Sequence, residues 1–215
     1  MRRTVAVVTA GLRQPSSTRL LADRLAEATR RELERLGAEV EIETIEVRDH
    51  GHDLVNNHIV GYPSEELERV LGKVARADGL IAVTPTFTTS YNGLFKMFVD
   101  VLDDTALIGK PVLIAATGGT ARHSLVLDHG LRPLFSYLRA TVVPTGVFAG
   151  PEDWGATGST GAAGTTGSAG AAEAPLARRV ERAAAELARE VDRRDPPAPD
   201  DPFESPVPFG GLLPP

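Results

Sequence analysis

The stretch TVAVVTAGLRQPSSTRLL, residues 4–21, joins a run of apolar residues to the start of an amphipathic pattern. The run predicts a buried strand, and the pattern after it predicts a helix. The segment between them, residues 9–19, is therefore expected to be a loop that leaves the carboxyl end of a strand and enters the N-terminus of a helix. In an open parallel sheet, loops of this kind bind ligands.

Further apolar runs predict strands at 40–47, 79–84, 111–117 and 141–147. The run at 40–47 interleaves apolar residues with glutamates, which is typical of a half-exposed strand at a sheet edge. Helical patterns lie between the strands, at 21–36, 64–78, 92–104 and 125–139. The regular alternation predicts an α/β fold, with a parallel sheet, right-handed crossovers and helices on both faces.

Three residues mark expected helix boundaries. Gly37 follows the first helical pattern as a C-terminal stop, and Ser64 precedes the second as an N-cap. Pro133 should kink the helix at 125–139 or mark its restart.

The composition changes abruptly after Trp154. Residues 1–154 are interpreted as one domain, and the Gly/Ala/Ser/Thr tract at 155–172 as a flexible linker. Residues 173–194 read as a helix with a thin apolar stripe, and the Pro-rich end at 195–215 as a disordered tail.

Composition restricts the possible functions. The chain has 29 acidic and 23 basic residues, and its basic residues are dispersed, which argues against a nucleic-acid partner. With no cysteine, disulfides and thiolate sites are excluded. No apolar stretch reaches the roughly 18 residues of a membrane span, and the N-terminus does not resemble a secretory signal. We therefore expect a cytoplasmic protein without a membrane partner.

The first loop carries Gly11, Arg13, Ser16, Thr18 and Arg19 just ahead of a helix. Backbone N–H groups, hydroxyls and guanidinium groups could converge there on an anion such as a phosphate monoester. The alternative is that a serine only caps the helix and the arginines are solvated.

The second loop, TPTFTTSYNG at 84–93, offers flat apolar surface at Phe87 and Tyr91 among small hydroxyl residues. It could form a wall for a planar ring. The alternative is a surface loop that turns at Asn92–Gly93.

The third loop, ATGGTARHS at 116–124, has two glycines that allow the backbone to approach a ligand and offer N–H donors. The alternative is a plain Gly-Gly turn. His123 and His129 flank the helix start beside this loop, and we interpret them as capping or surface residues.

A different hypothesis concerns DHGHD at 49–53, which with His58 could suggest a metal site. The full ligand arrangement is missing. We therefore expect no metal and a polar loop after the edge strand.

Taken together, GLRQPSSTRLL, TPTFTTSYNGLFKMFVDVLDD and PVLIAATGGTARHSLVLDHGLRPLFSYL resemble the NAD(P)H-dependent FMN reductases of the flavodoxin-like superfamily. The resemblance covers roughly residues 3–154. It is strongest to the reductases that supply reduced flavin to luciferase-like or sulfonate monooxygenases.

The resemblance implies a flavodoxin-like, doubly wound sheet of five parallel strands in the order 2-1-3-4-5. The first loop, with Gly11, would hold the FMN phosphate at Arg13, Ser16, Thr18 and Arg19. The second would run along the isoalloxazine ring at Pro85, Thr86 and Phe87, followed by Ser90. The third would face the pyrimidine end of the ring at Thr117, Gly118 and Gly119. The chain departs from the family pattern at Asn92, Phe95 and Met97.

The implied activity is hydride transfer from NAD(P)H, with NADPH preferred, to N5 of FMN. No residue of the chain is expected to act as a catalytic acid or base, and the N–H dipoles of Gly118 and Gly119 would support the ring. Reduced FMN could then diffuse to a partner monooxygenase. The alternatives are a quinone or azo-type reductase, a flavodoxin-type electron carrier, and a non-enzymatic interaction module. A homodimer or tetramer is expected, with the helix at 92–104 at the interface.

Overall fold

The structure is a computed structural model that describes residues 1–154 and 169–194. The predicted linker at 155–172 lies outside the described residues except for its last four positions. The predicted tail at 195–215 lies wholly outside them.

Parallel strands form the centre of the fold. These are β1 (Arg2–Thr9), β2 (Glu39–Glu46), β3 (Gly79–Phe87), β5 (Pro111–Thr117), β6 (Thr141–Val142) and β7 (Val147–Ala149). Their order is β2-β1-β3-β5-β6, and β7 also pairs with β5. This is the predicted order 2-1-3-4-5, and the half-exposed β2 lies at the edge, as its alternating pattern predicts.

Two details of the sheet differ from the prediction. The expected fifth strand at 141–147 is split into β6 and β7. Val142 pairs with Val112 and Val147 with Ala115, so residues 142–147 run beside the shorter interval 112–115 and bulge out around Pro144. In addition, the short strand β4 (Ser90–Tyr91) pairs antiparallel with the end of β3.

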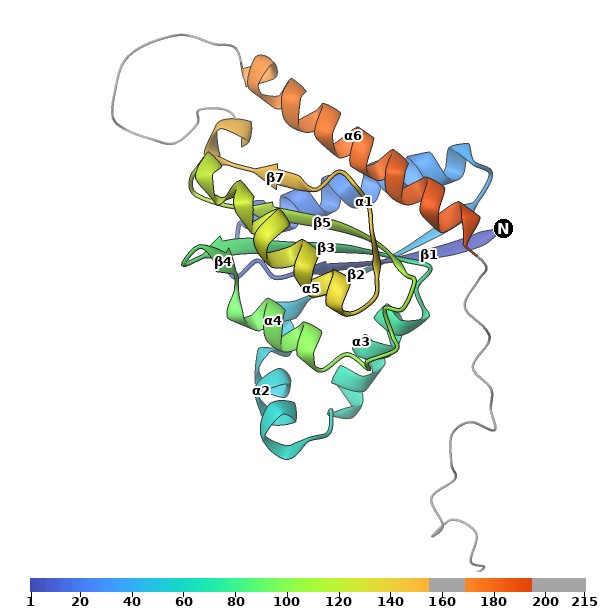
Figure 1. Cartoon of the computed structure of the whole chain (residues 1–215), viewed down its shortest axis with the longest axis vertical. Helices are drawn as coiled ribbons and strands as arrows, with labels where there is room; N and C mark the ends of the chain where they lie inside the picture. Colours follow the sequence, from blue (N-terminus) through green and yellow to red (C-terminus); the bar gives the residue numbers. More distant parts are fainter. Residues whose placement is uncertain (155–168, 195–215) are drawn as a thin grey trace, which may run out of the picture.

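Helices cover both faces of the sheet (Figure 1). On one face lie α1 (Ser17–Arg35) and α6 (Ala169–Arg193). On the other lie α2 (Gly51–Val60), α3 (Glu65–Arg76), α4 (Gly93–Asp100) and α5 (Arg132–Tyr137). The strands alternate their side chains between the two layers: Val5 and Val7 pack on the α1 side, and Ala6 and Val8 on the other.

The helix boundaries confirm three predictions from the sequence. The Ser64 hydroxyl accepts a hydrogen bond from the Leu67 N–H at 3.2 Å. Gly37 follows α1 with a φ of +89°, a conformation that glycine adopts without steric cost. Pro133 lies in the first turn of α5, directly after a π-helical turn, Leu127–Leu131 (η3), so it marks a restart.

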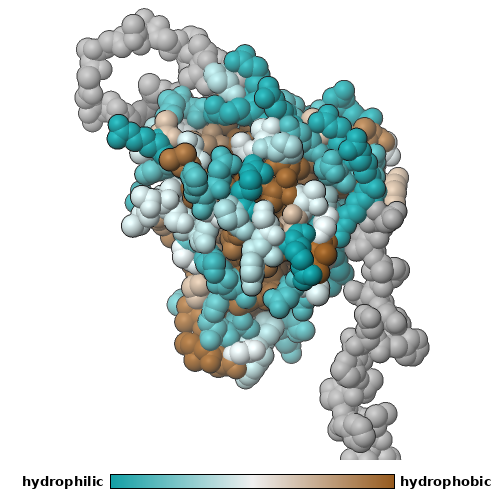
Figure 2. All heavy atoms as spheres, in the orientation of Figure 1, coloured by the Kyte–Doolittle hydropathy of each residue, from teal (hydrophilic) through white to brown (hydrophobic). Residues whose placement is uncertain are grey.

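The expected polar loop at 49–53 is wrong. His50 ends a 3₁₀ turn, Val47–His50, and α2 begins at Gly51. Helix α2 buries Leu54 and leaves Val55 and Ile59 exposed, and Figure 2 shows apolar surface at the lower end of the molecule, over this helix. In the described ranges no group of three or more His, Cys, Asp or Glu side chains is placed to hold a metal ion.

Helix α6 packs on the sheet as part of the α1 layer. Its apolar stripe is buried against α1, β5 and β7 and comprises Leu176, Val180, Ala183, Ala184, Leu187, Ala188 and Val191. The thin apolar stripe expected for residues 173–194 is thus part of a broader buried face. Neither α6 nor any other helix in the described part of the chain is long and apolar enough to cross a membrane.

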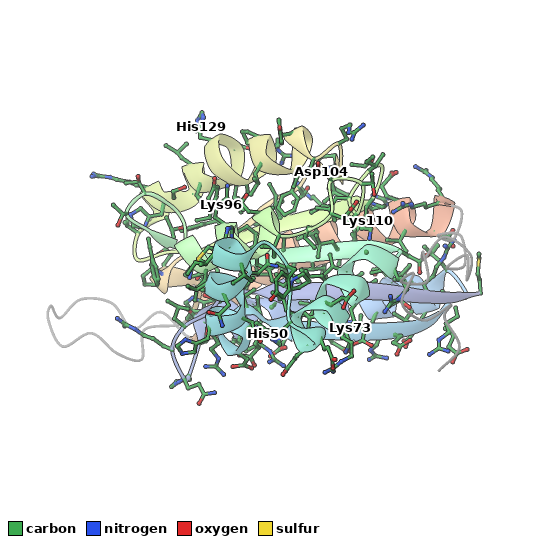
Figure 3. All side chains as sticks on the ribbon, turned by 90° about the horizontal axis from the view of Figure 1, so that it is seen from below. His50, Lys73, Lys96, Asp104, Lys110 and His129 are labelled. Atoms are coloured by element: carbon green, nitrogen blue, oxygen red, sulfur yellow. The ribbon has the colours of Figure 1, made fainter. Side chains whose placement is uncertain are left out.

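At the end of the strands opposite the three loops, two buried cations bind the carbonyl oxygens at the C-terminal ends of two helices. Arg3 donates to the Asp78 carboxylate at 3.1 Å and to the carbonyl oxygens of Asp192 and Arg194, each at 2.9 Å. Lys110, labelled in Figure 3, donates to the carbonyl oxygens of Val74 and Ala75 at the end of α3. Burial lowers the pKa of Lys110 to about 8; Arg194 acts in the same direction and Asp78 opposes it.

Candidate functional site

The first loop closes tightly onto the start of α1. The Ser16 hydroxyl accepts a hydrogen bond from the Arg19 N–H at 3.2 Å and caps the helix. A Cβ at Gly11 would lie 2.1 Å from this hydroxyl oxygen. A side chain at position 11 would therefore displace the Ser16 cap.

The structure separates the two arginines of this loop. Arg19 pairs with Asp23 at 2.7 Å and also with Glu46, which in turn pairs with Arg48 at 2.9 Å. In residues 1–154 and 169–194, by contrast, no hydrogen bond or ion pair involves the Arg13 guanidinium. Arg19 is held by carboxylates of the chain itself, whereas Arg13 is exposed and available to an anion.

The second loop turns at Thr88–Thr89 and not at Asn92–Gly93. Phe87 pairs with Ser90, and the two threonines between them have φ values of +47° and +70°. This left-handed conformation suits a two-residue hairpin but is strained for β-branched side chains. The tip of the hairpin holds Phe87 with 48% of its surface exposed.

Asn92 joins the second loop to the first. Its side-chain amide donates to the carbonyl oxygen of Ala10 at 3.2 Å, and its side-chain oxygen accepts from the Phe95 N–H at 2.7 Å. Its backbone N–H donates to the Thr84 hydroxyl at 3.2 Å. In the sequence Asn92 stood out only as a departure from the family pattern. The structure shows it fully engaged, as the N-cap of α4 and as the contact to the end of β1.

The third loop meets the first through two threonines. The buried hydroxyls of Thr18 and Thr117 lie 2.9 Å apart and share a hydrogen bond. The Gly118 N–H is donated to the Ala149 carbonyl oxygen at 3.2 Å, so it is not available to a ligand. Gly119 faces open space, because a Cβ there would meet nothing within 4 Å. Of the two glycines, Gly119 is therefore the one that a ligand can approach.

The loops lie side by side because their strands are neighbours. Thr9, at the end of β1, pairs with Val83, and Thr117, at the end of β5, pairs with Pro85, so both strands end beside the last residues of β3. Pro85 and Thr86 are buried at the base of the second loop. The predicted site residues thus gather at the carboxyl ends of the parallel strands. Arg19 is the exception, because its guanidinium is paired with Asp23 and Glu46.

A hollow of about 590 Å³ lies between the hairpin and the segment after the third loop. Of the predicted site residues, only Ser90 lines it. It also involves Arg122, His123 and His129, which the sequence analysis did not assign to a site. The signal in the sequence was weak, since these residues lie in a 3₁₀ turn, Ala121–Leu125 (η2), and in η3, which have no simple apolar period.

The residues present fit FMN. Arg13 offers a free guanidinium for the phosphate, and Phe87 offers an exposed aromatic face. Among the described residues, the Thr86 hydroxyl and His123 Nδ1 are buried and have no hydrogen-bond partner. Buried polar atoms of this kind are rare unless a ligand or water satisfies them.

The contacts of Asn92 generate a prediction. Asn92→Ala would leave the Phe95 N–H and the Ala10 carbonyl oxygen buried without their partner, so the free energy of unfolding should fall by about 2 kcal/mol. Urea unfolding of the purified protein measures this. Asn56→Ala on the exposed side of α2 is the matched control, and a loss no larger than in this control would contradict the assigned role.

Comparisons with known proteins establish the family of the chain. Residues 3–155 match the family of NADPH-dependent FMN reductases. The FMN reductase (NADPH) of Pseudomonas aeruginosa is 40% identical over 152 residues, which cover 70% of this chain and 78% of that protein. The NADH-dependent FMN reductase SfnF of Pseudomonas putida is 36% identical over 69% of this chain and 77% of its own length. The solved structure of an oxidoreductase from Corynebacterium diphtheriae is 44% identical, with a TM-score of 0.80 over 90% of this chain and 99% of that one. The chain therefore belongs to the NADPH-dependent FMN reductase family.

Proposed function

We propose that the chain is an NAD(P)H-dependent FMN reductase whose three loops form one slot for the flavin. The observation that carries this proposal is the hydrogen-bonded convergence of the loops, on which the Arg13 guanidinium and the Phe87 ring are both exposed. When bound, FMN supplies the hydride acceptor at N5.

The phosphate end of the slot is assigned to the first loop. Arg13 pairs with the phosphate, and the Ser16 hydroxyl, which uses only an acceptor position in its cap, still has its proton to donate. Thr18 is engaged with Thr117, so its role is to fix the loops relative to each other. Arg19 acts indirectly, by holding the start of α1 against Glu46.

The ring end of the slot is assigned to the second and third loops. Pro85, Thr86, Phe87 and Ser90 form one wall, and Thr117, Gly118 and Gly119 form the other. Because the Gly118 N–H is already bonded, Gly119 is the N–H that can support the pyrimidine end of the ring. None of these residues is a carboxylic acid or a histidine, which agrees with a reaction that needs alignment more than acid–base help.

The proposal is tested by following the nicotinamide absorbance of purified protein with NADPH or NADH, with and without added FMN. We expect consumption that requires FMN. Bound flavin without consumption would indicate an electron carrier, and consumption only with an added quinone or azo dye would indicate the other reductase class. The absence of both flavin binding and nicotinamide consumption would indicate an interaction module. NADPH is the preferred donor in this proposal, and the relatives include both NADPH- and NADH-dependent enzymes.

Arg13→Ala should weaken FMN binding about 10- to 100-fold, because it removes a charge-assisted pair with the phosphate. Riboflavin, which lacks the phosphate, should bind both proteins equally. Arg19→Ala is the matched control, and its effect should be smaller because Arg19 is already paired with two carboxylates. Fluorescence quenching of the flavins gives the six affinities of the three proteins for FMN and riboflavin. An equal loss for FMN and riboflavin in Arg13→Ala would refute the assignment.

We also propose that reduced FMN leaves the slot for a partner monooxygenase. The exposure of Phe87 and Arg13 supports this, because a flavin held between them stays open to solvent on one side. Recovery of reduced FMN in an anaerobic filtrate after one turnover is the expected result, and its full retention with the protein would contradict it.

We further propose a homodimer or tetramer. The helix expected at the interface, α4, does not itself require a partner chain, because α2 covers one side of it and His58 Nε2 lies 3.2 Å from the Met97 carbonyl oxygen. The support is instead the exposed apolar surface of α2 and the turn after it, at Val55, Ile59, Val60 and Tyr62. Light scattering should give two or four times the chain mass of 22.8 kDa, and the mass of one chain at micromolar concentration would contradict the proposal.

A further inference from the structure

The hollow beside the flavin slot has a size suited to part of a ligand. Its volume of about 590 Å³ lies within the usual range of small-molecule sites. It opens between the tip of the β3–β4 hairpin and the η2–η3 segment. Its lining comprises Thr89, Ser90, Thr120, Arg122, His123, Leu125, Val126, His129 and Gly130.

Cationic and hydrogen-bonding groups gather in this hollow. Arg122 and two histidines line it, and no lining residue is acidic. The nearby Asp128 pairs with Arg132 at 3.1 Å. Across the described parts of the chain, no partner is recorded for the Arg122 guanidinium, and the backbone N–H of Arg122 is bonded to the Thr120 hydroxyl at 3.2 Å. In a chain with a net charge of −6, the Arg122 guanidinium is a local positive charge.

The hollow is continuous with the proposed flavin slot. Ser90 belongs to both. His123 packs directly on Gly118 of the third loop, because a Cβ at Gly118 would lie 2.9 Å from the His123 Cβ. His129, which also lines the hollow, projects outward from the ribbon in Figure 3. A ligand that starts at the ring can therefore extend past Ser90 and His123 into the hollow.

We propose that the hollow receives the phosphate-bearing adenosine half of the nicotinamide dinucleotide, with Arg122 paired to one of its phosphates. This inference rests on the proposed function, since the nicotinamide must lie against the flavin while the rest of the dinucleotide extends away from it. The hydroxyls of Thr89, Ser90 and Thr120 are suited to the ribose. Leu125, which is 61% exposed, and the buried Val126 provide an apolar surface for the adenine.

Arg122→Gln tests the proposal, with Arg69→Gln on the exposed side of α3 as the control that removes the same charge elsewhere. The KM for the dinucleotide should rise about 10-fold in Arg122→Gln, with kcat and the affinity for FMN retained. Arg69→Gln should match the unsubstituted protein. A larger rise for NADPH than for NADH would place the 2′-phosphate at Arg122, and an equal rise would place the pyrophosphate there; both support the proposal.

An unchanged KM, or a parallel loss of FMN affinity, would overturn the proposal. A binding measurement separates this inference from the proposed function. Adenosine 2′,5′-bisphosphate, titrated by calorimetry into flavin-free protein, should bind about 10-fold more weakly to Arg122→Gln. If that dependence holds but no FMN-dependent NADPH oxidation occurs, the proposed function fails and the anion site stands. If oxidation occurs and neither KM nor calorimetry responds to Arg122, the inference fails alone.

Discussion

The candidate site depends on a small set of buried hydrogen bonds that join loops from three strands. Asn92 connects the second loop to the carbonyl oxygen of Ala10, and Thr18 connects the first loop to Thr117. Buried polar groups are costly when unpaired, so each of these contacts disfavours any arrangement in which the loops separate. The parallel sheet brings the three loops together at the carboxyl ends of its strands, and these contacts fix the spacing between the loops.

This arrangement divides the polar residues of the loops into two kinds. The first kind is buried and has its hydrogen bonds satisfied within the fold, so it forms the base of the slot; it comprises Thr18, Thr117 and Asn92. Arg13, Phe87 and Gly119 remain accessible above them. A rigid base under accessible groups is what a cofactor site requires, because ring alignment is lost when the supporting residues can move.

The sequence was sufficient where one physical signal dominates a segment. The strands follow from apolar runs, and the edge position of β2 follows from its glutamates, whereas the full strand order was implied by the family resemblance. Ser64 and Pro133 act locally. It was insufficient where the decisive partner is distant in the chain. The pairing of Arg19 with Glu46 and of the Gly118 N–H with Ala149 is set by strand register. Helix α2 is hidden because its apolar residues do not mark one buried face: Leu54 is buried, whereas Val55 and Ile59 are exposed. The split of the fifth strand is likewise set by its register with β5, in which residues 142–147 lie beside the shorter interval 112–115.

The arginines of this acidic chain fall into two groups that the sequence alone does not distinguish: those paired with carboxylates and those without such a partner. Arg3, Arg19 and Arg179 each pair with a carboxylate, and in those pairs the positive charge is neutralised within the fold. Arg13 and Arg122 have no such partner in the described residues, and they flank the proposed slot and its neighbouring hollow. Since the whole chain repels anions at long range, phosphate-bearing ligands must be attracted by local, unpaired cations. The positions of these two guanidinium groups, more than the number of arginines, therefore define where such ligands can bind.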